Sequence, residues 1–201
     1  MNTLIIIDVQ NDFLGGGSLE VPGSNMIVPV INQIQKHFDL VVATQDWHPE
    51  NHKCFAANHP GEKPYDTVKL RGYQQTLWPD HCIQGTKGAE LHPSLNTARV
   101  AAIFRKGMNP EIDSYSAFFD NNHKLSTGLA GFLKEKGTSE IHFCGVAADI
   151  CVYYSILDAI LEGFSSTLIE DATRPLNTEK FDETKCELVK LGVKIMRSSE
   201  L

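Results

Sequence analysis

The stretch LIIIDV, residues 4 to 9, is a run of aliphatic side chains interrupted only by the carboxylate of Asp8. Nearly continuous apolarity, without alternation between apolar and polar residues, is typical of a strand covered on both faces of its sheet. Five later runs share this character: LVVAT (40–44), VAAIF (100–104), IHFCGV (141–146), STLIED (166–171) and VKIMR (193–197). We therefore expect six strands in a mainly parallel sheet.

Between these strands, the spacing of apolar side chains predicts helices. Apolar residues recur at intervals of three and four in four segments: 24–38, 125–136, 149–161 and 178–191. A strand followed by a helix and then by a parallel strand makes a right-handed crossover, so we expect helices on both faces of the sheet. The predicted fold is α/β, a three-layer α/β/α sandwich around six strands, in a single domain that spans 1–201.

The composition excludes several classes of protein. A formal net charge of -7 leaves no basic stripe for nucleic acid. Five cysteines make an odd number with no C-x-x-C pair, which does not fit a secreted disulfide framework and favours the reducing cytoplasm. The N-terminal apolar run breaks at Asp8, too early for a signal peptide or a membrane span. We expect neither nucleic acid nor a membrane as a partner.

Two stretches of the chain lack any regular period. Residues 45–98 contain both tryptophans and five of the eight histidines, and 107–124 form the second irregular stretch. Long irregular segments inside a compact domain are usually functional loops, and ligands of open α/β sheets bind beyond the carboxyl ends of the strands. We expect 45–98 to be an insertion that carries a metal site.

Chemically reactive side chains follow the first four strands in turn. The first strand ends in Asp8, the second leads to Asp46-Trp47-His48, the third to Lys106 and the fourth to Cys151. Because parallel strands end at the same edge of a sheet, these groups are expected to meet in one crevice.

A thiol, an ammonium and a carboxylate at one edge can form a nucleophilic centre. Cys151 in the first turn of a helix would meet free N–H groups, and Lys106 would add positive charge, so both favour the thiolate. Asp8 could take the thiol proton and return it to a leaving group. Taken singly, each residue also has a structural interpretation, namely a core thiol, a solvated lysine and a capping carboxylate. Their joint placement favours catalysis.

The loop after the second strand is rich in imidazole and carboxylate groups. Asp46 and His48 form an Asp-x-His pair, His52 and His59 follow, and His81 comes from a distant part of the insertion. Loop histidines are common without a metal, but this combination of ligand types suits Zn²⁺, Fe²⁺ or Mn²⁺. The pattern indicates a candidate divalent metal site.

Five motifs together resemble those of one enzyme family: DVQNDF (8–13), TQDWHPENH (44–52), WPDHCIQGT (78–86), FRKG (104–107) and GVAADICV (145–152). They are similar to the motifs of nicotinamidases, also called pyrazinamidases, which are isochorismatase-like cysteine hydrolases. The resemblance covers at least 4–171. It implies hydrolysis of nicotinamide to nicotinic acid and ammonia through a cysteine thioester, feeding NAD salvage, with pyrazinamide as a further substrate. Two alternatives stay open: a superfamily member acting on isochorismate or a carbamoyl substrate, and a non-catalytic metal-binding or thiol redox module.

Carried over residue by residue, the resemblance implies a catalytic triad. Cys151 would be the nucleophile, Asp8 the general acid/base and Lys106 the cation that stabilises the ionised triad. The resemblance also implies a cis peptide bond between Val146 and Ala147. The N–H groups of Ala147 and Cys151 would then form an oxyanion hole, in which each donor typically contributes about 3 kcal/mol to stabilisation of the transition state.

The resemblance also implies a cofactor, one divalent metal ion per chain. Its ligands would be Asp46, His48 and His81, with His52 as a further candidate, whereas His59 matches no ligand position. Zinc is the first choice, and iron and manganese are the alternatives because such sites accept several first-row ions.

For the substrate, the resemblance implies a small-molecule pocket in which the pyridine nitrogen of nicotinamide faces the metal. Phe13, Trp78 and Tyr115 would pack around the ring, and Val146 is also assigned to substrate binding. Ile150 is apolar where some relatives carry a histidine, so no hydrogen bond to the substrate is expected from it. The oligomeric state, including a homo-oligomer, stays open.

Overall fold

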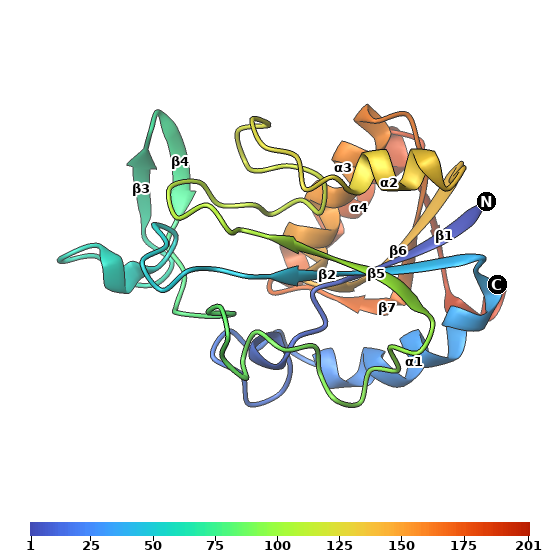
Figure 1. Cartoon of the computed structure of the whole chain (residues 1–201), viewed down its shortest axis with the longest axis horizontal. Coiled ribbons are helices and arrows are strands. Elements are labelled where there is room, and N and C mark those ends of the chain that lie inside the picture. Colours follow the sequence, from blue (N-terminus) through green and yellow to red (C-terminus); the bar gives the residue numbers. More distant parts are fainter.

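The computed structural model describes residues 1–201, and a six-stranded parallel sheet lies at its centre (Figure 1). The strand order is β5-β2-β1-β6-β7-β8, and every neighbouring pair is parallel. The strands are β1 (Asn2–Ile7), β2 (Leu40–Asp46), β5 (Val100–Lys106), β6 (Glu140–Val146), β7 (Ser165–Arg174) and β8 (Lys194–Met196). The predicted sheet is therefore confirmed.

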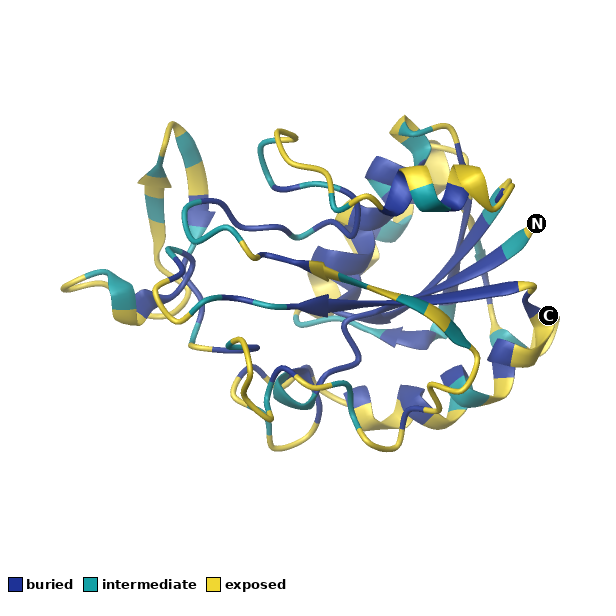
Figure 2. Cartoon of the chain, viewed as in Figure 1, coloured by how far each residue is buried: buried dark blue, intermediate teal, exposed yellow.

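Helices cover both faces of this sheet. One face carries α1 (Ile27–Ile34), and the other carries α2 (Leu129–Glu135), α3 (Tyr153–Leu161) and α4 (Thr178–Lys190) (Figure 1). Buried residues concentrate in the sheet and on the inward sides of the helices (Figure 2). This is the predicted three-layer sandwich. None of the helices combines the length and the apolarity needed to cross a lipid bilayer.

Two of the helices are shorter than their periodicity predicts. Single 3-10 turns, Ser24–Met26 and Gln35–His37, flank α1. The segment 125–128 stays outside α2, because Thr127 donates its N–H to the Phe118 carbonyl and Gly128 adopts a left-handed conformation. At the start of α2, a hydrogen bond to the preceding loop thus takes the place of helical hydrogen bonding, while local 3-10 turns end α1.

Strand β1 occupies the centre of the hydrophobic core. Leu4, Ile5, Ile6 and Ile7 have no exposed surface, because β1 is a central strand between β2 and β6 and helices cover both faces of the sheet. Full burial of such a side chain contributes roughly 1.5–3 kcal/mol. The residue that follows this strand, Asp8, is therefore held at the edge of the best-packed part of the molecule.

Strand β5 departs from the expectation that both faces are covered. Val100, Ala102 and Phe104 face the α2 side, whereas Ile103 on the opposite face is 47% exposed. The reason is that β5 is an edge strand, and the connection from β2 to β5 contains no α-helix.

The insertion 45–98 contains a hairpin that the sequence patterns did not predict. Strands β3 (Thr67–Leu70) and β4 (Tyr73–Thr76) pair antiparallel and project from one end of the molecule (Figure 1). Arg71 and Gly72, which join the strands, both have positive φ, as hairpin turns of two residues require. These strands carry mostly polar side chains and face little core, so they lack an apolar signal.

Near its carboxyl end, β6 approaches β1 closely. Gly145 has φ +111, and a Cβ atom there would lie 2.0 Å from the Ile7 carbonyl oxygen. No residue with a side chain fits this position without moving the backbone of one strand. Gly145 thus allows β6 to lead directly into the segment that carries Cys151.

We predict that Gly145→Ala destabilises the protein more than Gly163→Ala. Gly163 also has positive φ, but nothing lies within 4 Å of a Cβ atom there. The conformation alone costs about 1–2 kcal/mol, and overpacking at Gly145 adds about 1–3 kcal/mol. Urea unfolding followed by circular dichroism measures both losses. Equal losses of stability in the two variants would show that the close contact with Ile7 adds no cost at Gly145.

Candidate active site

The three residues predicted to form a nucleophilic centre meet at the carboxyl edge of the sheet. Lys106 Nζ lies 2.9 Å from Asp8 Oδ2 and 3.6 Å from Cys151 Sγ. Asp8 directly follows β1, Lys106 is the last residue of β5, and Cys151 lies in the turn after β6. All three are buried. The parallel sheet therefore brings Lys106 into contact with Asp8, 98 residues earlier in the sequence, and with Cys151, 45 residues later.

Lys106 is surrounded by more acceptors than it has protons. Besides Asp8 and Cys151, its ammonium contacts the Asp46 carboxylate and the Ser114 carbonyl. Burial opposes the positive charge, but the two carboxylates outweigh burial and raise the pKa of Lys106 well above its ordinary value. Lys106 is thus a permanent cation with three protons for four acceptors.

Asp8 is held as a carboxyl group that can exchange a proton near neutral pH. Thr44 Oγ1 donates to Asp8 Oδ1 at 2.6 Å, and the Asp8 N–H donates back to the same hydroxyl. Complete burial, aided by the negative charge of Asp46, raises the pKa of Asp8 to about 6, although Lys106 and Thr44 oppose this shift. A carboxyl group with such a pKa suits general acid and base chemistry.

Cys151 lies in one π-helical turn, Ala148–Val152, immediately before α3. Burial raises the pKa of its thiol well above the ordinary value, while Lys106 acts in the opposite direction. Lys106 favours the thiolate, as the sequence indicated, but desolvation has the larger effect on the resting thiol. The thiol needs a nearby base to ionise.

The peptide bond between Val146 and Ala147 is cis, as the family resemblance implied. Ala147 lines the same cavity as the thiol, and its N–H has no backbone acceptor. A residue of the cavity lining thus has a backbone donor without a protein acceptor.

Asp46, His48 and His81 form a second cluster beside the first. His48 Nε2 and His81 Nε2 lie 3.7 and 3.9 Å from Asp46 Oδ2. Each ring can donate its Nδ1 proton to a backbone carbonyl, that of Gly107 for His48 and that of Pro79 for His81. In that tautomer both Nε2 lone pairs face the carboxylate. Three protein ligands oriented by hydrogen bonds to carbonyl groups are typical of a catalytic metal site.

Charges within this cluster are strongly coupled. Although burial opposes ionisation, Lys106 and His48 hold the pKa of Asp46 well below its usual range. Burial also disfavours the charged form of His48, but the Asp46 carboxylate raises the pKa of His48 overall. Burial and the neighbouring His48 lower the pKa of His81 to about 4. An anionic oxygen beside a neutral imidazole is the donor set that a divalent cation prefers.

His52 lies beside this cluster, but its ring has the opposite tautomer to those of His48 and His81. Its Nδ1 accepts the Cys54 N–H at 3.0 Å, so the neutral ring carries its proton on Nε2. That Nε2 is buried and has no hydrogen-bond partner. In this tautomer His52 offers a hydrogen-bond donor, while one of its ring nitrogens also lies within 4.8 Å of ligand atoms of His48, Cys54 and Asp113, a grouping that could hold a metal ion. His59 points elsewhere and contacts the Lys53 carbonyl.

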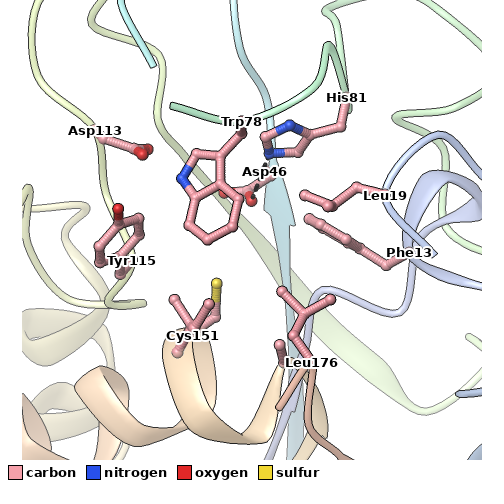
Figure 3. A pocket seen from close by; sticks show the side chains of 11 residues that line it. Phe13, Leu19, Asp46, Trp78, His81, Asp113, Tyr115, Cys151 and Leu176 are labelled. Carbon is pink, nitrogen blue, oxygen red and sulfur yellow. Dashed lines mark ion pairs between the residues drawn. The ribbon is translucent and has the colours of Figure 1, made fainter. Parts of the chain in front are cut away.

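A narrow cavity of about 30 Å³ connects the thiol with the metal-site candidates (Figure 3). The Cys151 sulfur points into it, with Tyr115 on one side and Phe13 on the other. Eleven residues line it: Phe13, Leu19, Asp46, Trp78, His81, Asp113, Tyr115, Ala147, Ile150, Cys151 and Leu176. Of the residues expected around the ring, Val146 is absent, because its side chain is packed in the core.

Three lining residues were missed by the sequence interpretation. Asp113 is buried and accepts hydrogen bonds from the Ser114 N–H and from Gln75 Nε2. Its position in the irregular stretch 107–124 was the available signal. Leu19 and Leu176 carry no chemical signal, and only the tertiary structure places them at the cavity.

Comparison with known proteins identifies the class of this protein. The model of the isochorismatase domain matches residues 2–200, so the chain belongs to the isochorismatase family. A nicotinamidase of Acinetobacter baylyi is 49% identical over 174 residues, which cover 87% of this chain and 81% of that protein. The resemblance to nicotinamidases is thereby confirmed.

Solved structures agree with this assignment. The structure of an Acinetobacter baumanii nicotinamidase and pyrazinamidase superimposes with a TM-score of 0.96 at 44% identity, covering 99% of this chain and 97% of that one. A pyrazinamidase of Pyrococcus horikoshii in complex with zinc superimposes with a TM-score of 0.81 at 34% identity, covering 98% of each chain. The fold is therefore isochorismatase-like.

We predict that Gly107→Ala weakens metal binding. A Cβ atom at Gly107 would lie 2.2 Å from His48 Cε1, so the imidazole would have to leave its position opposite Asp46. Loss of orientation by a neighbouring group typically lowers metal affinity 10- to 100-fold, so about this loss is expected. Competition with a chromophoric chelator measures zinc affinity. Gly128→Ala is the control, since its φ is also positive but its Cβ would meet nothing; equal affinities in the two variants would contradict the prediction.

Proposed function

We propose that this protein is a nicotinamidase, an amidohydrolase that converts nicotinamide to nicotinic acid and ammonia, and that it also hydrolyses pyrazinamide. The observation that carries the proposal is the buried contact of Asp8, Lys106 and Cys151 at the floor of a cavity with aromatic walls. Its supporting context is 49% identity to a nicotinamidase. The nicotinic acid produced would feed NAD salvage.

The first step is transfer of the thiol proton from Cys151 to Asp8. The buried centre holds two carboxylates, Asp8 and Asp46, and one cation, Lys106. Moving the proton from sulfur to Asp8 leaves the net charge of this centre unchanged, so no additional charge has to be buried. Lys106 stays within reach of the new thiolate. The sulfur then attacks the carboxamide carbon, and a C–S bond forms.

The second step is departure of ammonia. Asp8, now protonated, gives its proton to the amide nitrogen, the C–N bond breaks, and a thioester of nicotinic acid remains on Cys151. Asp8 is again a carboxylate and can take a proton from water, which attacks the thioester. Release of nicotinic acid returns the proton to sulfur. One carboxyl group thus acts as base, acid, base and acid in turn.

Backbone donors would stabilise the oxyanion formed in each step. We assign this role to the N–H groups of Ala147 and Cys151. The Ala147 N–H lacks a backbone acceptor and lies at the cavity. A donor of this kind typically contributes about 3 kcal/mol.

Asp46, His48 and His81 would hold one divalent metal ion, with zinc as the first choice. The arrangement of one carboxylate oxygen and two imidazole lone pairs supports this, as does the zinc complex of the Pyrococcus horikoshii relative. When bound, the ion would supply a Lewis acid for the lone pair of the pyridine nitrogen. Phe13 and Trp78 would flank the ring.

We further propose that residues 1–201 form one hydrolase domain, in which the insertion 45–98 serves to supply the metal ligands. His48 and His81 both come from this insertion, and their rings lie 5.0 Å apart. All five cysteines are free thiols, which supports a reducing compartment such as the cytoplasm.

We predict that Cys151→Ala abolishes the reaction. Removal of the nucleophile prevents thioester formation, so release of ammonia from nicotinamide should fall by at least about 1,000-fold. A coupled assay for ammonia measures it. Cys186→Ala is the matched control, because Cys186 is an exposed thiol on α4, and it should keep wild-type turnover. Retention of activity by Cys151→Ala would refute the mechanism.

We predict that kcat/KM falls in acid with a midpoint near pH 6. Asp8 must be ionised to accept the thiol proton, and its pKa is raised to about 6, so protonation of Asp8 as the pH falls through this value removes the base. Steady-state kinetics with nicotinamide measure the profile, and metal content determined at each pH shows whether the ion stays bound. A midpoint at the ordinary carboxyl value of about 4 would contradict the assignment.

A further inference from the structure

The carboxylate of Asp149 has no place in the mechanism, yet it is one of the most buried charged groups in the molecule. It lies two residues before Cys151, in the same π-helical turn. Asp149 Oδ1 accepts the Leu176 N–H at 2.9 Å, and Oδ2 accepts the Asn177 N–H at 3.1 Å. No lysine, arginine or histidine pairs with it. Its two oxygens are therefore stabilised by two backbone N–H donors and by no charged side chain.

These hydrogen bonds hold a segment that no regular element fixes. Strand β7 ends at Arg174 and α4 begins at Thr178, so 175–177 form a free connection. Asn177 caps α4 by accepting the Lys180 N–H at 2.9 Å. Asp149 thus lies at the positive end of α4, where a carboxylate is favoured, and ties this end to the turn that carries the nucleophile.

The segment held by Asp149 delivers one side chain to the cavity. Leu176 lines it next to Phe13 and Leu19, on the side opposite Tyr115 and Asp113 (Figure 3). Leu176 is partly buried and packs against the core. The N–H groups of Leu176 and Asn177 both donate to Asp149, so this segment is tied directly to the turn that carries the thiol.

We propose that Leu176 determines which substituents on the substrate ring are admitted, and that Asp149 is the positioning residue that holds Leu176 at a constant distance from Cys151. This inference rests on the proposed function. An apolar wall fixed to the nucleophile's own turn would accept flat, unsubstituted aromatic amides such as nicotinamide and pyrazinamide. It would exclude amides with an alkyl group on the side that meets Leu176.

The experiment compares nicotinamide with its 2-, 4-, 5- and 6-methyl derivatives. Ammonia release gives kcat and KM for the wild type and for Leu176→Ala. A pocket discriminates one methylene by about 10- to 200-fold, so shortening Leu176 should raise kcat/KM for at least one methyl derivative, relative to nicotinamide, by about tenfold or more. Unchanged ratios for all four derivatives would overturn the proposal.

Variants of Asp149 test the positioning role. Asp149→Ala should raise KM for nicotinamide by about tenfold. It should also change kcat/KM for the methyl derivatives, relative to nicotinamide, in the same direction as Leu176→Ala. Asp149→Asn keeps one carbonyl acceptor, so its changes should be smaller than those of Asp149→Ala. In the double variant Asp149→Ala/Leu176→Ala, the changes in relative kcat/KM should not add, because both substitutions act on the cavity wall that Leu176 forms. A fall in kcat alone, with KM and the ratios unchanged, would show a purely structural role and refute positioning.

Asp171→Asn is the matched control for these variants. Asp171 also accepts two hydrogen bonds, from the N–H and the hydroxyl of Ser198, but it lies away from the cavity. Asp171→Asn should leave KM for nicotinamide and the relative kcat/KM values of the methyl derivatives at wild-type values.

If the Asp149 variants do not fold, the Leu176→Ala variant by itself tests whether Leu176 selects the ring substituents. Failure of the wild type to release ammonia from any of these amides would refute the proposed function, whereas an active wild type with unchanged ratios would refute only this inference.

Discussion

The arrangement of the active site depends on one buried ammonium group. An isolated charge in a protein interior costs several kcal/mol, and loss of one partner of a buried ion pair costs about 3–5 kcal/mol. Lys106 is paired with Asp8 and Asp46, which follow or end strands β1 and β2. These pairs exist only when β5, β2 and β1 are neighbours in the sheet. The topology of the sheet and the chemistry of its edge therefore require one another.

Asp46 joins the catalytic and metal-site candidates through its two oxygens. Oδ1 contacts Lys106, while Oδ2 faces His48 and His81. A charge placed near Oδ2 must therefore change the balance of acceptors around Lys106, and through it the proton affinity of Asp8. The two clusters are physically one electrostatic unit, even though their residues come from separate strands and from a long insertion.

The six strands and the reactive residues at their ends could be predicted because both leave a local signal. Continuous aliphatic runs mark doubly covered strands, and a carboxylate such as Asp8 directly after such a run is unusual. The hairpin β3–β4 leaves no such signal, because its side chains are mostly polar and face little core. The core packing of the Val146 side chain could not be predicted for a related reason: its neighbours in the sequence do not reveal which side chains near the end of β6 face the core and which face the cavity.

By itself the sequence determined the fold class, the family motifs and the types of reactive group, since these follow from residue identity and from short-range spacing. Only the tertiary structure decided their protonation and their neighbours. Burial raises the pKa of Asp8 to about 6 and keeps the Cys151 thiol protonated, the Cys54 N–H sets the tautomer of His52, and Asp149 holds Leu176 at the cavity. Solvent exclusion and contacts between distant segments arise only after folding, so no local pattern encodes them.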